Sequence, residues 1–399
     1  MKGRFTKMPM QNKTILHIAN DYAGSKVYKN LVYELDQLDI QQIIYTAIRN
    51  KSKIGSNEIN LQVKDSKTIY SSILNWHLDR VLYPLKIFKI LRDIQSKIDL
   101  KQVKCIHAHT WYSDGGVAYF LSKKYDIPFI VTIRSTDLNI FQEKLAYLRP
   151  FGRKILTGAK QIILISASSE RKVLKQSSLK RVINQIEEKI KIIPNGVDYY
   201  WIENSSFGLS RKISNIFNVL YVGRFTDGKQ VSMLQEAIIQ LNNELSQKII
   251  LHIVGGGGND EGKVIELVKK HPDIFEFYGQ INDKDKLLTV FRRCDMFAMP
   301  SRYETFGLVY VEAMLQGLPL LYSEGEGIDG FYSEKIGEKT KNHTVHGIKE
   351  KLRIMIDNFE QYSIPLEEVK KNHNWSLIAK EYEKIYQDCI ESAAKNTYR

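Results

Sequence analysis

Short runs of branched apolar residues alternate with helix-length segments along the first half of the chain. The runs are rich in Ile and Val and show no polar alternation, which is typical of strands covered on both faces of a sheet. The segments between them are long enough for helices, so the pattern predicts βαβ units and a parallel sheet. The expected strands are Thr14–Ala19, Gln42–Ala47, Val103–Ala108, Phe129–Ile133, Ile162–Ile165 and Ile190–Ile193, and two expected helices are Lys26–Leu38 and Leu78–Ile94.

The same pattern begins again after residue 215. The second set of expected strands is Phe217–Val222, Ile249–Val254, Ile274–Tyr278, Met296–Met299 and Leu318–Tyr322. The helices expected with them are Val231–Leu245, Glu261–Lys270, Lys284–Arg293, Gly307–Leu315, Val345–Asn358 and Trp375–Ile390. A chain of 399 residues is too long for one ordinary core. We therefore predict two doubly wound, Rossmann-like α/β domains at residues 1–205 and 206–373, and a final helix in 374–399 that returns to the first domain.

Charge and cysteine content bound the setting of the protein. The formal net charge of +13 points to an anionic partner such as a nucleic acid, an acidic lipid surface or a phosphorylated ligand. The 3 Cys residues are scattered and include no Cys-x-x-Cys pair. We therefore expect no disulfide framework, no zinc site and a reducing, cytoplasmic setting. We also expect no membrane span, because no apolar run reaches the roughly 18 residues that cross a bilayer.

Two cations stand at a junction between a strand and a helix in the second half. A strand ends at Gly223, Arg224 follows it directly, and Lys229 comes just before a helix. Cations beside the N-terminus of a helix form a site for a diphosphate that needs no metal ion. Two solvated loop cations would give the same pattern, so this alternative stays open.

A run of four glycines follows the next strand, within His252–Gly258. Glycine lets backbone N–H groups approach an anion closely, so Gly255 and Gly256 are candidate phosphate contacts. The run does not match the Gly-x-Gly-x-x-Gly pattern of dinucleotide sites, with its later acidic residue. A plain tight turn is the alternative.

Two glutamates lie eight residues apart in the segment Ser301–Pro319. Glu304 follows an expected strand, and Glu312 lies within the next expected helix. Eight helical residues cover about 12 Å, which suits a sugar hydroxyl at one carboxylate and ribose hydroxyls at the other. Two unrelated surface glutamates are the alternative, but an unpaired carboxylate is costly among the apolar neighbours of Glu312. Backbone amides that would face the phosphates between the two glutamates are those of Thr305, Phe306 and Gly307.

Taken together, these segments resemble the retaining GT-B glycosyltransferases of glycosyltransferase family 4, also described as glycosyl transferases group 1. The family pattern holds a Gly-Arg…Lys phosphate clamp, a glycine-rich turn and a Glu-x7-Glu element that leads into Ala-Met and Gly-x-Pro, and all occur here in order. The resemblance implies a GT-B fold, in which two Rossmann-like domains face a central cleft. It also implies a nucleotide diphosphate sugar as donor, with UDP-sugars or GDP-sugars first, and a glycan or lipid-linked acceptor. Retention of anomeric configuration, no other cofactor and no metal complete the expectation.

The resemblance also implies roles for single residues. Arg224 and Lys229 would stabilise the charge on the departing diphosphate. Glu304 would orient the sugar, and Glu312 would anchor the ribose. In the first half, His109 of the His-Ala-His element takes the family's place beside the donor sugar.

Some positions of the first half and one loop of the second depart from the family pattern. Ala23–Lys26 replaces the usual Gly-Gly-x-Glu loop, although Gly24 can still present a backbone N–H to the diphosphate. Arg134 stands where members often have His, and Asp137 is a candidate acceptor or sugar contact. Gly325–Phe331 replaces the commoner Gly-Gly loop, and the sequence gives no physical account of that change.

Three other functions fit part of the pattern. A nucleotide-sugar epimerase on the same fold would need acid and base carboxylates near the sugar in the first domain. A nucleic-acid-binding protein fits the charge, but the chain lacks a recognition module, so we expect no nucleic acid partner. A catalytically inactive homologue fits the altered loop at Gly24. We favour sugar transfer in surface polysaccharide assembly, by family analogy.

Basic and apolar residues interleave around the helix expected at Leu78–Ile94. The cations are Arg80, Lys86, Lys89 and Arg92, and the apolar residues are Trp76, Leu78, Val81, Leu82, Leu85, Ile87, Phe88 and Leu91. A second basic stretch covers residues 149–181. This composition suits an interfacial helix, so we predict an anionic membrane surface as a partner, at the inner face of the plasma membrane. An ordinary helix packed on the sheet, with solvated cations, is the alternative.

Overall fold

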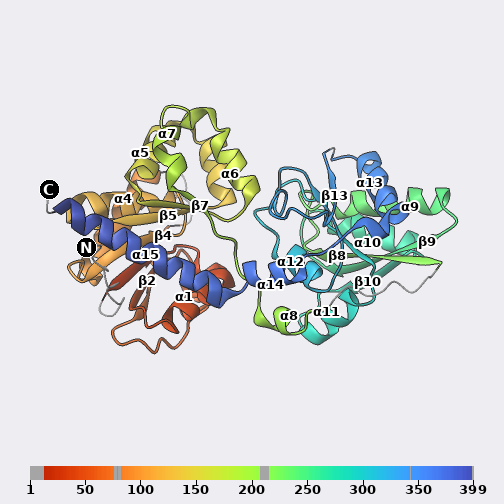
Figure 1. Cartoon of the computed structure of the whole chain (residues 1–399), viewed down its shortest axis with the longest axis horizontal. Helices are drawn as coiled ribbons and strands as arrows, with labels where there is room; N and C mark the ends of the chain where they lie inside the picture. The colour runs from red at the N-terminus through yellow and green to blue at the C-terminus, as the bar shows by residue number, and fades with distance from the viewer. Residues whose placement is uncertain (1–12, 76–78, 80–81, 207–214, 342, 398–399) are drawn as a thin grey trace, which may run out of the picture. The chain divides into compact units, whose positions relative to one another are not determined.

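The computed structural model describes residues 13–75, 79, 82–206, 215–341 and 343–397, and the chain forms two compact units (Figure 1). Unit 1 holds the chain up to Ile165, the segment Lys172–Asn195 and the C-terminal helix from Trp375. Unit 2 holds Ser166–Arg171 and Gly196–Asn374. The domain boundary that we expected at residue 205 lies within unit 2 by this division.

Unit 1 is built on a seven-stranded sheet with the strand order β3-β2-β1-β4-β5-β6-β7. Every neighbouring pair is parallel, and the order reverses between β1 and β4, which confirms the doubly wound prediction. The sequence missed β3, because this edge strand is largely half-exposed and lacks a buried apolar run. The strands are β1 (Thr14–Ile18), β2 (Gln42–Ala47), β3 (Lys67–Ser71), β4 (Val103–Ala108), β5 (Phe129–Ile133), β6 (Gln161–Leu164) and β7 (Ile190–Ile192).

Helices connect these strands and cover the sheet. They are α1 (Lys26–Asp36), α3 (Tyr83–Lys97), α4 (Ser113–Tyr125), α5 (Arg149–Gly158), α6 (Ala167–Leu174), α7 (Ile183–Ile186) and α15 (Trp375–Thr397). α3 begins at Tyr83, with Pro84 in the first turn, where a missing backbone N–H costs no helical hydrogen bond. The predicted interfacial residues before it, Trp76, Leu78, Arg80 and Val81, lie outside the described residues.

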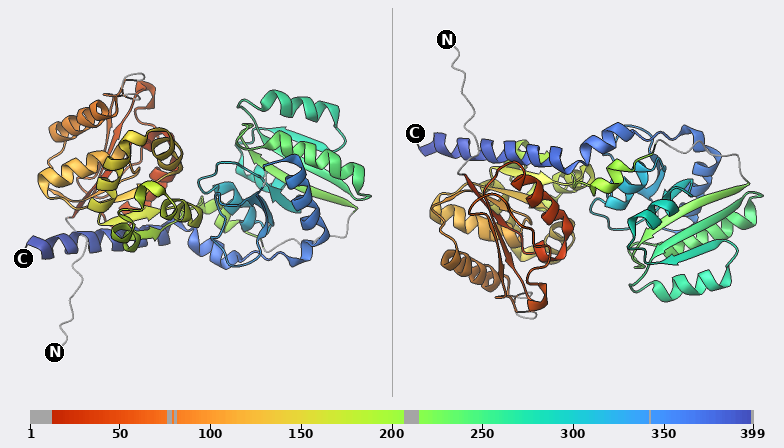
Figure 2. Two further views of the ribbon diagram at one scale, coloured as in Figure 1. Left: turned by 90° about the horizontal axis from the view of Figure 1, so that it is seen from above. Right: turned by 90° about the horizontal axis from the view of Figure 1, so that it is seen from below.

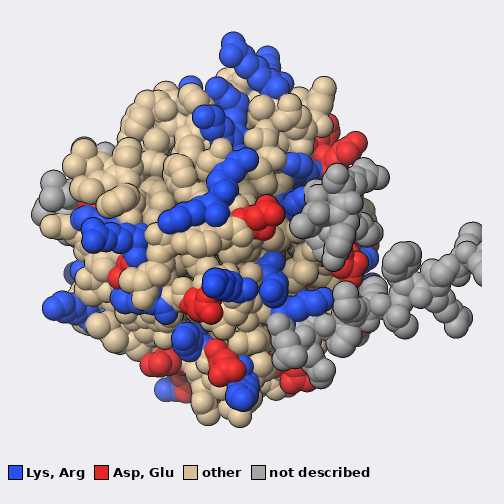
Figure 3. Space-filling model, turned by 90° about the vertical axis from the view of Figure 1, so that its left-hand side faces the viewer, with Lys and Arg blue, Asp and Glu red and all other residues tan. Residues whose placement is uncertain are grey.

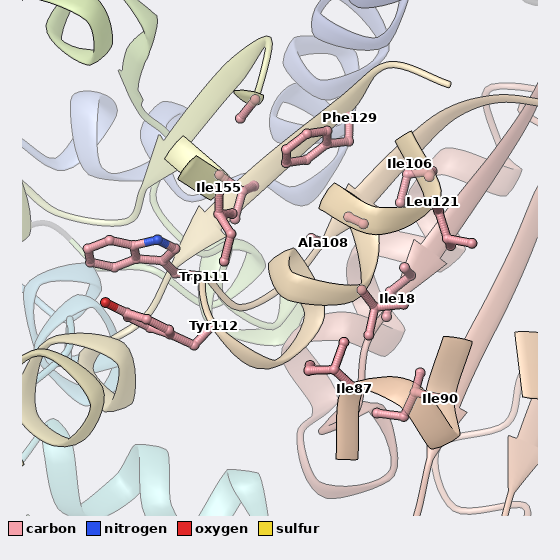
Figure 4. Packing of buried hydrophobic residues seen from close by; sticks show 14 of the residues in the cluster. Ile18, Ile87, Ile90, Ile106, Ala108, Trp111, Tyr112, Leu121, Phe129 and Ile155 are labelled. Carbon is pink, nitrogen blue, oxygen red and sulfur yellow. The ribbon is translucent and has the colours of Figure 1, made fainter. Parts of the chain in front are cut away.

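The core of unit 1 lies between the sheet and its helices. Figure 4 shows Ile18, Ile106 and Phe129 of the strands with side chains from the covering helices. α3 buries Ile87 and Ile90, at a helical spacing that turns one face of the helix inward. This face of α3 therefore packs on the sheet, and a membrane contact through the exposed face stays a prediction.

Unit 2 repeats the architecture with six strands in the order β10-β9-β8-β11-β12-β13, again all parallel. The strands are β8 (Ile216–Gly223), β9 (Lys248–Gly255), β10 (Phe275–Gly279), β11 (Met296–Ala298), β12 (Leu320–Ser323) and β13 (Gly337–Thr340). The helices are α8 (Tyr199–Glu203), α9 (Val231–Glu244), α10 (Glu261–Lys270), α11 (Lys284–Phe291), α12 (Leu308–Leu315), α13 (Val345–Asp357) and α14 (Leu366–Asn372). The missed strand is again an edge strand, β13, whose sequence Gly-Glu-Lys-Thr is polar.

The C-terminal helix α15 is 23 residues long and belongs to unit 1, beside which it runs in every view (Figures 1 and 2). It packs against α1 and β4. Tyr386 Oη lies 2.8 Å from His107 Nδ1, and Cys389 Sγ lies 3.4 Å from Cys105 Sγ. Neither α15 nor any other helix in the described part of the chain combines the length and the apolar composition that a membrane crossing requires.

Candidate active site

The strands β8 and β9 of unit 2 end side by side, and both end in glycine. Gly223 of β8 pairs with Gly255 of β9 in the sheet register. Gly255 has φ +140°, and a Cβ atom there would lie 1.8 Å from the Gly223 carbonyl oxygen, so only glycine fits. Because parallel strands end at one edge of a sheet, the segments after β8, β9 and β11 lie at the same edge. Three predicted motifs therefore meet at the carboxyl edge of this sheet.

The glycine turn after β9 packs directly on the segment after β8. Phe225 N donates to Gly257 O at 2.8 Å, and a Cβ atom on Gly258 would lie 2.2 Å from Phe225 O. Gly257 N donates to Glu261 Oε1 at 2.8 Å, so this N–H is not open to a phosphate. Backbone packing thus accounts for these glycines, as a tight turn predicts. A phosphate contact at Gly255 or Gly256 stays a prediction.

Two of the predicted catalytic side chains contact each other at this edge. Lys229 Nζ forms an ion pair with Glu304 Oε2, and the two side chains are 26% and 12% exposed. The two loops are also joined through the backbone, where Arg302 N donates to Gly228 O at 2.8 Å. The fold thus joins the lysine of the expected clamp to the glutamate of the expected sugar contact, which stand 75 residues apart in the sequence.

The other predicted cation, Arg224, stands at the same edge but is not held in place. Its side chain is exposed, and within the described part of the chain it forms no hydrogen bond or ion pair. Its carbonyl oxygen accepts from Tyr221 Oη at 2.9 Å, which fixes the backbone. The guanidinium therefore keeps its full set of donors for an anion.

The segment Gly325–Phe331, which the sequence left unexplained, holds the loop that carries Glu304. Glu326 Oε2 accepts from Glu304 N at 2.9 Å. Gly327 N donates to Glu304 O at 3.0 Å, and a Cβ atom on Gly327 would lie 3.0 Å from Glu304 Cγ. This segment therefore positions the predicted sugar-orienting carboxylate from its backbone.

The stretch between the two predicted glutamates is held tightly. Thr305 N donates to Glu304 Oε1 at 3.0 Å, which removes this N–H from the phosphate contacts that we expected. Phe306 is 1% exposed, so its side chain belongs to the core. Gly307 has φ +79° at the start of α12, and a Cβ atom there would lie 2.6 Å from the Tyr310 ring. Phe306 and Gly307 can therefore contact a ligand through their backbone groups alone.

Glu312 lies in the middle of α12 and, among the described residues, has no hydrogen bond or ion pair. Burial first, and then the Asp198 carboxylate, raise the pKa of Glu312 to about 7 against the opposing effect of Lys284. A half-buried carboxyl group without a protein partner is suited to accept hydrogen bonds from the hydroxyls of a ligand. The ribose contact that we expected at Glu312 stays a prediction.

In unit 1, His109 directly follows β4 and lies in a cluster of three buried imidazoles. His17 Nδ1 and His109 Nε2 are 3.0 Å apart, and the rings of His107 and His109 stack with centroids 3.8 Å apart. His107 is hydrogen-bonded through both nitrogens, to Tyr386 Oη at 2.8 Å and Thr132 Oγ1 at 3.0 Å. Burial is the main reason that the pKa of His109 lies well below its usual value. The neighbouring rings of His107 and His17 lower it further, because a protonated ring would repel a second positive charge. The cluster is therefore neutral.

The same cluster is the one group of side chains in the described part of the chain that could hold a metal ion. Nitrogens of His17, His107 and His109 lie within 4.8 Å of one another. His17 Nε2 and His109 Nδ1 have no partner, whereas both nitrogens of His107 are already engaged. That the activity needs no metal remains a prediction.

The other residues predicted in unit 1 hold its loops. Gly24 N donates to Asp21 O at 3.0 Å within a turn, so this N–H is not open to a diphosphate as we expected. The carboxylate of Asp137 accepts from the backbone N–H groups of Trp111 at 3.0 Å, Tyr112 at 3.1 Å and Arg134 at 2.9 Å. Asp137 is 1% exposed and committed to the backbone, which corrects our expectation of an acceptor or sugar contact there.

Sequence reasoning missed two residues that the structure places in direct contact with predicted ones. Glu326 lies 22 residues from Glu304, and only the fold brings its carboxylate to that backbone. His17 lies in β1, where the sheet register sets it opposite His107 of β4. Histidines in two buried strands that a doubly wound sheet makes neighbours are the signal that could have found it.

Both halves of the chain match family models of known enzymes. Residues 210–380 match Glycosyl transferases group 1, and residues 25–200 match Glycosyltransferase Family 4. An uncharacterized glycosyltransferase of Methanocaldococcus jannaschii is 27% identical over 324 residues, which are 77% of this chain and 81% of that protein.

Solved structures share the fold of this chain. Sucrose-phosphate synthase from Thermosynechococcus elongatus has a TM-score of 0.69 with this chain, covers 95% of it and 100% of its own length, and is 19% identical. HepE of Anabaena, solved in complex with UDP and glucose, has a TM-score of 0.63, covers 94% and 100%, and is 16% identical. At these identities the likeness shows the fold.

Proposed function

We propose that the chain transfers a sugar from a nucleotide diphosphate sugar to a glycan or lipid-linked acceptor. The premise is that it is a GT-B glycosyltransferase, which both family models and the shared fold support. The observation that carries the proposal is the Lys229–Glu304 ion pair at the carboxyl edge of the unit 2 sheet, where the Arg224 side chain is exposed. This edge offers two cations for a diphosphate and a carboxylate for a sugar hydroxyl. Retention, independence from metal ions and a part in surface polysaccharide assembly belong to the same proposal.

Lys229 and Glu304 exchange partners when the donor binds. The diphosphate attracts the Lys229 ammonium, and the released Glu304 carboxylate accepts hydrogen bonds from the sugar. As the bond from the anomeric carbon to the diphosphate oxygen breaks, negative charge develops on that oxygen. Arg224 and Lys229 stabilise this charge, an effect of several kcal/mol in comparable sites.

The acceptor oxygen then bonds to the anomeric carbon from the face that the diphosphate leaves. The departing phosphate oxygen takes the acceptor proton, so the anomeric configuration is retained. Glu312 binds the ribose hydroxyls and contributes to affinity more than to rate. His109 keeps the role that the resemblance implies, which is to position the donor sugar.

A panel of nucleotide sugars tests the donor. A true donor binds the folded state alone, so it raises the midpoint of thermal unfolding, by about 2.7 kcal/mol of stability at a hundred times its Kd. UDP-sugars come first, because UDP is bound by HepE, which shares the fold. No shift with any UDP- or GDP-sugar would contradict the proposal.

Product analysis tests the reaction. With donor and acceptor, NMR should show a new glycosidic bond with the anomeric configuration of the donor. Without acceptor, no epimer of the donor should form, and an epimer would make the chain an isomerase. Turnover should persist in EDTA, and loss of turnover that magnesium or manganese restores would contradict metal independence.

A further inference from the structure

An apolar groove of about 500 Å³ lies on the surface of unit 1, between α3, α4 and the start of α5. α3 contributes Ile87, Phe88 and Leu91, α4 contributes Phe120, and α5 contributes Phe151. The three phenyl rings come from three different helices of one unit. The groove therefore arises from the packing of the helices and not from one amphipathic segment.

The rim of the groove is apolar as well, and it is open to solvent. Phe88 is 59% exposed and Phe120 is 43% exposed. Leu82 and Leu85, in the residues around the start of α3, are 46% and 39% exposed. Single exposed apolar residues are ordinary, but a contiguous set of large ones marks a surface that binds something.

Each helix that contributes a phenyl ring also carries a cation one turn further on. Arg92 follows Phe88 by four residues, and Lys124 follows Phe120 by four. Lys154 follows Phe151 by three. These spacings place ring and cation on the same face of each helix. All three cations are exposed, and within the described residues none of them forms an ion pair.

The structure changes which cations of α3 can act at a surface. Lys86, which we expected to contribute, is 7% exposed and donates to Ser113 Oγ at 2.7 Å. Lys89 is paired with Asp79 at 2.9 Å. Arg92 is thus the cation of α3 that is open to a partner.

The two units differ sharply in charge. Unit 1 carries 36 Lys and Arg against 19 Asp and Glu, whereas unit 2 carries 22 against 26. The excess of +13 in the whole chain therefore comes entirely from unit 1. Figure 3 looks onto unit 1, and Lys and Arg outnumber Asp and Glu on that face.

We propose that the groove and its three cations form a docking surface for an anionic phospholipid bilayer. Aromatic rings enter the interface between headgroups and acyl chains, and long basic side chains reach back to the headgroups. A polyanion alone would use the cations and leave the groove empty. A second copy of the chain would face an equally basic unit, so the charges would oppose it. The proposal stands whether or not the acceptor is lipid-linked.

Flotation of the full chain with vesicles tests the proposal. The protein should float with phosphatidylcholine vesicles that contain phosphatidylglycerol, and not with phosphatidylcholine alone. Binding should weaken as salt shortens the Debye length below about 10 Å, above 0.1 M. Each of Arg92→Glu, Lys124→Glu and Lys154→Glu should lower the partition coefficient about fivefold or more, the factor that matches about 1 kcal/mol per basic residue.

Removal of the rings separates this surface from a merely basic one. Phe88→Ser and Phe120→Ser leave the charge unchanged, and together they should lower partitioning at least about tenfold. Matched controls in unit 2 are Lys248→Glu, Lys269→Glu and Lys286→Glu for charge and Ile354→Ser for an exposed apolar residue, and these should bind vesicles as the unchanged chain does. Unaltered thermal midpoints and unaltered stabilisation by the donor would show that fold and donor site are intact.

Three results would overturn the proposal. The first is equal recovery with neutral and anionic vesicles. The second is loss of binding in the unit 2 controls to the same degree as in the unit 1 variants. The third is a concentration-dependent dimer that Phe88→Ser abolishes, because a second copy would then occupy the groove.

Discussion

Units 1 and 2 share the doubly wound parallel sheet but place their polar groups differently at the ends of the central strands. In unit 1, His17 and His109 are buried, neutral and hydrogen-bonded to each other. In unit 2, Arg224, Lys229 and Glu304 are charged and open to solvent to different degrees. The same fold thus carries a buried, neutral histidine cluster in unit 1 and a partly exposed, charged pair in unit 2.

This difference indicates that the carboxyl edges of the two sheets have different roles. An open ion pair can exchange one partner for a charged ligand at little cost, because water already solvates it in part. In the buried neutral cluster two nitrogens already lack a partner among the described residues, and loss of the His17–His109 hydrogen bond would leave a further polar atom unsatisfied. We therefore expect substitutions at the unit 2 edge to act on turnover, and substitution of His17 in the unit 1 cluster to act on stability.

The largest effect should come from the cations of unit 2. Arg224→Ala and Lys229→Ala should each lower kcat by about a hundredfold to a thousandfold, because the charge on the leaving diphosphate loses a partner. The midpoint of thermal unfolding should change little, since both residues lie on loops. Lys269→Ala on α10 is the control. Near-normal turnover in either variant would show that the substituted cation does not bind the diphosphate.

The next effect should appear in unit 1, on stability. His17→Leu leaves His109 Nε2 buried without its partner at 3.0 Å, which should lower the free energy of unfolding by about 1–3 kcal/mol. Denaturant unfolding measures this. Tyr33→Leu on the exposed side of α1 is the control. An unchanged free energy of unfolding would show that His109 tolerates a second unpaired nitrogen besides Nδ1, and the comparison between the units would fail.

A smaller effect should come from the loop that positions Glu304. Glu326→Ala removes the acceptor of Glu304 N and should lower kcat about tenfold, since a misplaced group loses rate without losing the fold. Glu326→Gln keeps an acceptor oxygen at the same length and should recover most of the rate. If Gln is as slow as Ala, the charge of Glu326 matters and its hydrogen bond does not.

The smallest effect should be the pH dependence of stability at Glu312. Its pKa in the folded protein is raised to about 7, above the ordinary value of 4.5, so ionisation costs stability as pH rises through this window. Glu312→Gln should therefore unfold at a higher temperature than the unchanged chain at pH 8, and at a similar temperature at pH 4.5. Saturating donor should remove the difference at pH 8, because ribose hydroxyls then satisfy the carboxylate. A constant difference at both pH values would contradict this assignment.

Strands rich in apolar residues were predictable from the sequence, including the edge strands β7 and β10, whereas the two polar edge strands were not. β1 and β8 consist mostly of large apolar residues, and such a segment is typical of a strand inside a covered sheet. β3 and β13 have neighbours on one side only, so their sequences need no apolar pattern. The missed β3 and β13 thus differ from the predicted edge strands β7 and β10 in their polar sequence and not in their place in the sheet.

Contacts within a motif were predictable, and contacts between motifs were not. The order Gly223, Arg224, Lys229 is legible in the sequence, and the structure sets these residues at one edge. The Glu326 contact depends on a hydrogen bond that closes over 22 residues, which no local pattern encodes. Lys86 shows a further error, because we expected an exposed cation there and its helix turns the side chain inward beside the buried Ile87.

The return of α15 to unit 1 has a consequence for synthesis. A ribosome makes the sheet of unit 1 first, but Cys105 and His107 of β4 gain their contacts with Cys389 and Tyr386 only when the last helix emerges. By then unit 2 is complete, because domains fold as they leave the ribosome. Unit 1 is therefore begun before unit 2 and finished after it, and a nascent chain stalled before residue 375 would expose a strand that α15 otherwise covers.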